Sequence, residues 1–158
     1  MKRILAIALS LLLAACGASM NLHRLAPGSV TLEQMRAKQK PTAEWKNADG
    51  TVTLEYSKQP VTAYNVMLDF DAKGALKQSR IVSVAENISL LKTGMTRAEV
   101  QRQVGSPASI FKDPATGGDI WEIPTDFPTD DYPQRAIIIH WHPVVDAATR
   151  IEMGNHYK

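Results

Sequence analysis

Two histidines near the C-terminus have a spacing that could bind a metal ion. His140 and His142 alternate along a predicted strand, so their side chains share one face and could serve as two ligands if a third came near. Asp69 would be the third ligand, but no spacing in the sequence supports it. We therefore predict no metal and no cofactor, and we keep a carrier of a metal or small ligand as a minor alternative.

Residue patterns typical of enzymes are absent from the sequence. The chain has one cysteine, no Gly-x-Ser-x-Gly motif and no glycine pattern for binding phosphates or dinucleotides. Carboxylate pairs occur at Asp130 and Asp131 and at Asp69 and Asp71. These pairs lie in a proline-rich segment and in a predicted hairpin, where solvated turn residues are the simpler interpretation. We therefore expect no catalytic residues.

The single cysteine, Cys16, ends a segment typical of export signals. A basic start is followed by an apolar run over residues 4–13, which is too short for a permanent membrane span. Residues 13–16, Leu-Ala-Ala-Cys, resemble a bacterial lipobox, which implies cleavage before Cys16 and acylation at it. Acyl chains anchor a protein at roughly 0.8 kcal/mol per buried methylene. We predict a signal peptide over residues 1–15, lipid attachment at Cys16 and an acylated tether over residues 16–26.

Removal of this signal changes the charge of the protein. The full chain has 18 basic and 16 acidic side chains. Loss of Lys2 and Arg3 leaves equal numbers, so the mature chain is near neutral and does not indicate nucleic-acid binding. Gly17 follows the cysteine where an aspartate would favour the inner membrane. By resemblance to enterobacterial sorting, this implies a lipid anchor in the outer membrane and a folded part on its periplasmic face.

One pattern occurs twice in the chain. In residues 94–107, Thr96 is a predicted helix N-cap with Glu99 three positions on, and Gly105 with Pro107 ends the helix. The offset between Gly28 and Gly94 superposes six residues of the first half, namely Gly28, Glu33, Arg36, Pro41, Trp45 and Lys46, on Gly94, Glu99, Arg102, Pro107, Phe111 and Lys112. Six matches without a gap predict a tandem repeat.

Each repeat is predicted to contain one helix and three strands. The first unit covers residues 27–83 and the second covers residues 84–158, and the first helix is expected over residues 31–39. Alternating apolar residues predict strands over 51–56, 63–70, 75–82, 119–123, 135–142 and 148–153. The three tryptophans are predicted to fill the cores: Trp45, Trp121 and Trp141. The predicted fold is α+β, with two tandem units that each pack a helix on one face of a three-stranded antiparallel sheet.

A helix on one face of such a sheet leaves the opposite face open. In the predicted register, the open faces carry Met67, Asp69, Glu55, Ile120, Glu122, Ile138, His140 and His142. Residues 124–134 are predicted to form a projecting loop, in which exposed aromatic side chains would be costly unless they bind a partner. The partner-binding candidates are therefore Phe127, Tyr132, Met67, Asp69, Ile138, His140 and His142.

The lipobox and the second unit together contain a recognisable set of motifs: Gly94-Met95-Thr96, Glu99-Val100, Gly105-Ser106-Pro107 and Phe111. This set resembles the SmpA/OmlA (BamE-like) family of outer-membrane lipoproteins, which implies a compact α+β unit with helices on a three-stranded sheet. The first unit fits only in outline, since Ser29-Val30 replaces Met-Thr and Lys40 replaces the glycine. Two units in place of one resemble the β-lactamase inhibitor proteins, whose tandem sheets grip another protein.

These resemblances imply an outer-membrane-anchored periplasmic lipoprotein that acts as a non-enzymatic protein-binding module. Outer-membrane protein assembly or envelope integrity is the role implied, with the barrel-assembly complex as the partner, the lipid anchor in the membrane and no nucleic acid. The alternative is a protein inhibitor of an envelope hydrolase, like the inhibitors of β-lactamase or lysozyme. Fold-level resemblance transfers more securely than either role.

Overall fold

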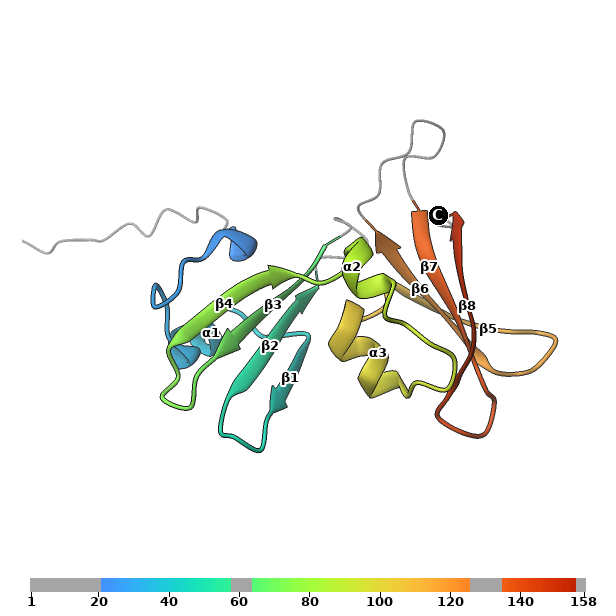
Figure 1. Cartoon of the computed structure of the whole chain (residues 1–158), viewed down its shortest axis with the longest axis horizontal. Coiled ribbons are helices and arrows are strands. Elements are labelled where there is room, and N and C mark those ends of the chain that lie inside the picture. The colour runs from blue at the N-terminus through green and yellow to red at the C-terminus, as the bar shows by residue number, and fades with distance from the viewer. Residues whose placement is uncertain (1–20, 58–63, 126–134, 156–158) are drawn as a thin grey trace, which may run out of the picture.

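The computed structural model describes residues 21–57, 64–125 and 135–155 (Figure 1). Several residues named above lie outside these ranges: Lys2, Arg3, Cys16, Gly17, Phe127, Asp130, Asp131 and Tyr132. None of the helices in the described ranges is long and apolar enough to cross a membrane.

The first unit is a four-stranded antiparallel sheet in the order β1-β2-β3-β4. The strands are β1 (Ala43–Lys46), β2 (Val52–Ser57), β3 (Asn65–Phe70) and β4 (Leu76–Ile81). Two short helices precede them, the 3₁₀ helix η1 (Leu22–Arg24) and the α-helix α1 (Leu32–Lys38). Leu22 and Met35 pack into the core of this sheet, so the folded body begins within the segment expected to be a tether.

The second unit repeats this order of elements. Two helices, α2 (Ala85–Ile88) and α3 (Arg97–Val104), are followed by a sheet in the order β5-β6-β7-β8. Its strands are β5 (Ser109–Lys112), β6 (Asp119–Thr125), β7 (Arg135–Trp141) and β8 (Ala148–Asn155). The buried side chains of this core are Val100, Val104, Trp121, Ile123, Ile137, Ile139, Trp141 and Ala148.

The predicted fold of a helix on a three-stranded sheet is wrong. Each sheet has a fourth strand, β1 or β5, and the described chain is mostly strand with only short helices. Sequence alternation missed these strands because each is only four residues long and lies at a sheet edge. In β1, for example, the alternation rests on just two apolar residues, Ala43 and Trp45.

In both units, a glycine with a left-handed backbone precedes the longer helix and ties the chain to the last strand of the sheet. Gly28 and Gly94 have φ angles of 74° and 88°. Their N–H groups donate at 2.8 Å to the carbonyls of Leu76 and Ala148, the first residues of β4 and β8. Gly28 and Gly94 are thus equivalent in three dimensions, as the repeat predicted.

The helices, however, are displaced by one position from the predicted alignment. The N-cap of α1 is Thr31, whose capping-box partner is Gln34, whereas Thr96 of α3 pairs with Glu99. The first unit therefore has one extra residue between its glycine and its N-cap. Glu33 is not equivalent to Glu99, because the capping role belongs to the next residue.

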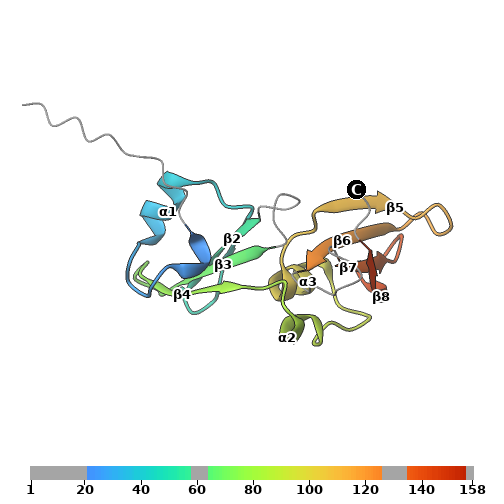
Figure 2. The same ribbon diagram turned by 90° about the horizontal axis from the view of Figure 1, so that it is seen from above.

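Helix α3 lies between the two sheets, as the views in Figures 1 and 2 agree. Its buried residues Val100 and Val104 pack on the second sheet. Its C-terminal end, at Gly105 and Ser106, reaches the first sheet through hydrogen bonds. One helix thus belongs to one unit and covers a face of the other.

Candidate functional site

A buried carboxylate of the first sheet binds the end of α3. Glu55 on β2 is 0% exposed. Its Oε1 accepts the backbone N–H of Ser106 at 2.6 Å, and its Oε2 accepts the Ser106 hydroxyl at 3.0 Å and the Gln101 amide at 3.2 Å. Burial raises the pKa of the Glu55 carboxyl above its ordinary value, although these hydrogen bonds oppose the rise.

An asparagine beside Glu55 completes this junction. The Nδ2 of Asn65, on β3, donates to the carbonyls of Val104 at 3.1 Å and Ser106 at 2.9 Å. Gly105 lies between them with a φ of 90°, and a Cβ added there would overlap the Asn65 side chain. The carbonyl groups at a helix C-terminus have no intrahelical partners. The first sheet therefore holds the end of α3 by donating hydrogen bonds to these groups.

This junction covers Glu55 and Met67 of the predicted open face, whereas Asp69 still lines a pocket of about 260 Å³ on the first sheet. Met67 is 1% exposed, so it is part of the packed junction and not available to a partner. Asp69 is half-buried and bonds Arg80 at 2.8 Å and Thr53 at 2.8 Å within its own sheet. The physical reason is that the linked second unit supplies the cover that a single unit would lack.

Trp45 is also misplaced by the sequence interpretation. It pairs with Thr53 and so lies on the same face as Glu55, opposite the face that holds the core residue Leu54. The Arg102 guanidinium stacks above its ring at 5.6 Å from the centroid. Trp121 and Trp141, by contrast, are buried in the second core as predicted.

The corresponding face of the second sheet forms a groove. It has a volume of about 430 Å³ and is lined mainly by apolar side chains, with His140 and Glu152 among the polar ones. Phe111 of β5 is 45% exposed, and Met153 of β8 is 44% exposed. Ile138, a predicted partner-binding residue, lines the same groove but is largely buried. This groove is the surviving part of the predicted open face.

His140 is engaged by neighbouring charged groups. An Arg150 nitrogen lies 2.6 Å from its Nε2, and Oε1 of Glu152 lies 3.2 Å from the same atom. Asp113 approaches Nδ1 at 3.8 Å. Within residues 21–57, 64–125 and 135–155, no group of three histidines, cysteines or carboxylates is placed to hold a metal. The arrangement therefore fits an ion-paired rim of the groove.

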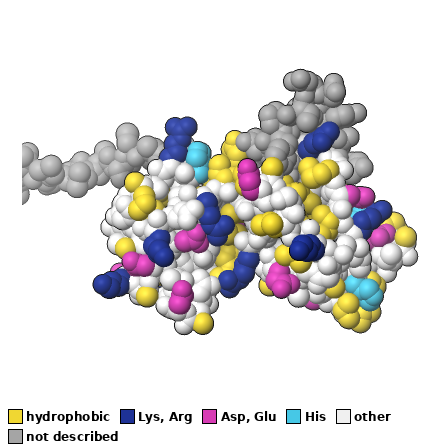
Figure 3. Space-filling view, viewed as in Figure 1, with side chains coloured by type: hydrophobic (Ala, Val, Ile, Leu, Met, Phe, Trp, Pro, Cys, Tyr) yellow, Lys and Arg dark blue, Asp and Glu magenta, His cyan; other side chains and the backbone are white. Residues whose placement is uncertain are grey.

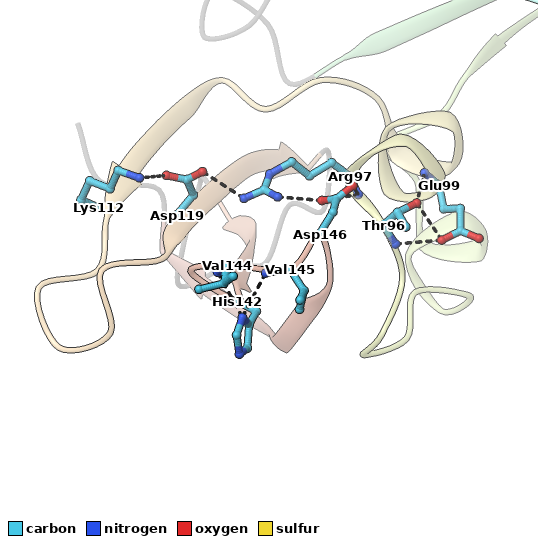
Figure 4. Close-up of polar contacts among 9 residues, drawn as sticks. All are labelled: Thr96, Arg97, Glu99, Lys112, Asp119, His142, Val144, Val145 and Asp146. Atoms are coloured by element: carbon cyan, nitrogen blue, oxygen red, sulfur yellow. Dashed lines mark hydrogen bonds and ion pairs between the residues drawn. The ribbon is translucent and has the colours of Figure 1, made fainter.

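His142 is not part of that groove. Its Nδ1 accepts the backbone N–H groups of Val144 and Val145, each at 3.2 Å, and so shapes the β7–β8 turn (Figure 4). Val144 is 86% exposed, and apolar side chains gather beside a histidine at this end of the hairpin (Figure 3). His140 and His142 thus have different hydrogen-bond partners, although both line a second pocket that also includes Asp113 and Arg150.

An arginine at the start of α3 holds the same hairpin. Arg97 bonds Asp146 at 2.6 Å and Asp119 at 3.0 Å, as Figure 4 shows. Its guanidinium also stacks on Trp141 at 4.6 Å from the ring centroid. A hydrogen bond from Lys112 is the main cause that lowers the pKa of Asp119, and Arg97 adds to it. Sequence analysis missed this network because its members come from four separate segments.

No protein-family model matches the chain, and no curated protein or solved structure is significantly similar to it. The resemblance to the SmpA/OmlA family therefore stays a prediction.

Proposed function

We propose that this chain is an envelope lipoprotein, anchored through Cys16, that works as a non-enzymatic protein-binding module. The groove on the second sheet is its partner-binding surface. The most specific role is outer-membrane protein assembly, to which the resemblance of the second unit points.

The groove is the observation that carries this proposal. Phe111 exposes a large apolar area on the sheet face that also holds Ile120, and Met153, which pairs with the core residue Ile137, borders the groove from the edge strand β8. Burial of apolar area stabilises association by about 25 cal/mol per Å², so such surface is costly in isolation and useful at an interface. The charged rim at His140 and Glu152 resembles the polar border typical of protein interfaces.

The anchor and the groove are tested together in membranes. A Cys16→Ser variant should leave the membrane fraction or stay unprocessed, because no acyl chain could then hold it. Unchanged fractionation with the outer membrane would refute the lipoprotein part. Wild type and a Phe111→Asp variant are then compared by affinity capture from envelope extracts, and we expect the variant to lose a protein that wild type retains.

Leu90 provides the matched control for this capture. It is an exposed apolar residue outside the groove, so Leu90→Asp adds the same charge without touching the surface under test. Equal capture by both variants would refute the groove as the binding surface. Barrel-assembly components as the captured partner support the assembly role, whereas a lysozyme-like or β-lactamase-like enzyme supports the inhibitor alternative.

A further inference from the structure

Equivalent positions on the two sheets follow from their strand registers. The register of β3 shifts immediately before Phe70, and the register of β7 shifts immediately before Trp141. The neighbouring strands pair in the same order in both sheets. Counting from these shifts gives five equivalent pairs: Met67 and Ile138, Glu55 and Glu122, Trp45 and Phe111, Asp69 and His140, and Arg80 and Glu152.

In the first sheet, α3 and the turn that follows it bind at these positions. Ser106 donates to Glu55, and Arg102 stacks on Trp45 and donates to Asn47 at 3.0 Å. The contact therefore has two parts, a helix end on a carboxylate and an arginine on an aromatic ring. It is a working example, within this chain, of how such a sheet face binds a helix.

In the second sheet, the equivalent positions line the groove. Glu122 is fully buried and already has contacts, so the accessible part lies over Phe111, Ile120, His140 and Glu152. Phe111 stands where the first sheet has the arginine-covered Trp45. Ile120 replaces Thr53, which makes this face more apolar than its counterpart.

We propose that the groove binds a short amphipathic helix of another protein, at the positions equivalent to those where the first sheet contacts the end of α3 and its Arg102. This inference rests on the proposed protein-binding function and names the kind of segment that is bound. The helix packs apolar side chains on Ile120 and places an arginine over the Phe111 ring, because a guanidinium is attracted to the face of an aromatic ring. A helix in a groove is an established mode of peptide recognition.

The charges at the rim are close to balanced, because Glu152 lies beside Arg150. Glu152 occupies the position that Arg80 has in the first sheet, so the sign of the charge is reversed. Arg150 lies 3.4 Å from Glu152 and offsets this reversal. The arginine on Phe111 therefore remains the main polar determinant of the bound helix.

The α3 segment itself is the probe for this proposal. An acetylated, amidated and fluorescein-labelled peptide of residues 96–107 is titrated into the intact protein, purified from the cell fraction in which it occurs, and binding is followed by anisotropy. We expect saturable binding that weakens at least fivefold with a peptide carrying Arg102→Glu. A Phe111→Ala protein should lose at least as much affinity, whereas Leu90→Ala should bind as wild type does.

Three results would overturn the proposal. The first is the absence of saturable binding up to millimolar protein. The second is binding that survives Phe111→Ala but fails with Asn47→Ala, because the peptide would then be replacing α3 on the first sheet. The third is concentration-dependent self-association that Phe111→Ala removes, since a second copy of the chain would then occupy the groove. If the peptide binds but Cys16→Ser leaves membrane fractionation unchanged, the groove remains supported as a binding site and the lipid anchor is refuted.

Discussion

At the scale of single residues, Gly105 shows how closely the two units approach. Any side chain at this position would be strained by the φ of 90°, and its Cβ would also overlap Asn65. Gly105→Ala should therefore lower the free energy of unfolding by about 2–4 kcal/mol, measured by urea denaturation. Gly94→Ala is the control, since its φ is 88° but nothing lies within 4 Å of an added Cβ. It should cost only about 1–2 kcal/mol, and equal losses would show that the Asn65 contact is unimportant.

Arg97 is the second residue whose position predicts a measurable effect. Arg97→Lys keeps the charge but removes the planar fork that reaches Asp119 and Asp146 and stacks on Trp141. We expect a loss of about 1–2 kcal/mol in the free energy of unfolding. Arg150→Lys, on a side chain that is 60% exposed, should cost less than about 0.5 kcal/mol. Losses of the same size would mean that the Arg97 network is only a surface ion pair.

At the scale of elements, the contact between β2 and the end of α3 should depend on pH. Burial raises the pKa of Glu55 in the folded state, so the folded chain binds this proton more readily than the unfolded chain does. The contribution of Glu55 to stability is therefore greatest below its unfolded pKa and is lost as the pH rises through its raised folded pKa.

A Glu55→Gln variant isolates this effect, because glutamine does not titrate. The free energy of unfolding of wild type minus that of the variant should increase as the pH is lowered from 7 to 4, measured by urea denaturation at each pH. A difference is needed because other carboxyls, such as Asp119 and Glu99, have lowered pKa values and give the opposite trend. A flat or decreasing difference would contradict the burial of an ionisable Glu55.

At the scale of the whole molecule, the junction should make the two units unfold together. Calorimetry of wild type should show one transition, with the calorimetric enthalpy equal to the van't Hoff enthalpy. Glu55→Ala combined with Asn65→Ala removes the hydrogen bonds to Ser106 and Val104 and should separate the transition into two. Arg36→Ala with Glu44→Ala is the control, because that ion pair lies within the first unit. Two transitions in wild type would show that the junction does not couple the units.

The sequence by itself determined the local elements. Most strands were found because apolar residues alternate along them, as in β3 and β7, and α3 was found because Thr96 and Glu99 form a capping box within four residues. The repeat was visible because six residues match at one offset, and two of them, Gly28 and Gly94, perform the same backbone task in the structure. These signals are local, so neighbouring residues are sufficient to encode them.

Only the tertiary structure decided which surfaces are covered. Alternation gives each strand two faces, but it does not say what packs on the second face. Met67 and Trp45 therefore proved to be junction residues, while Phe111, at the position equivalent to Trp45, remained exposed. The reason is physical: burial depends on elements that are distant in the sequence, and α3 reaches one sheet of this chain on that face and not the other.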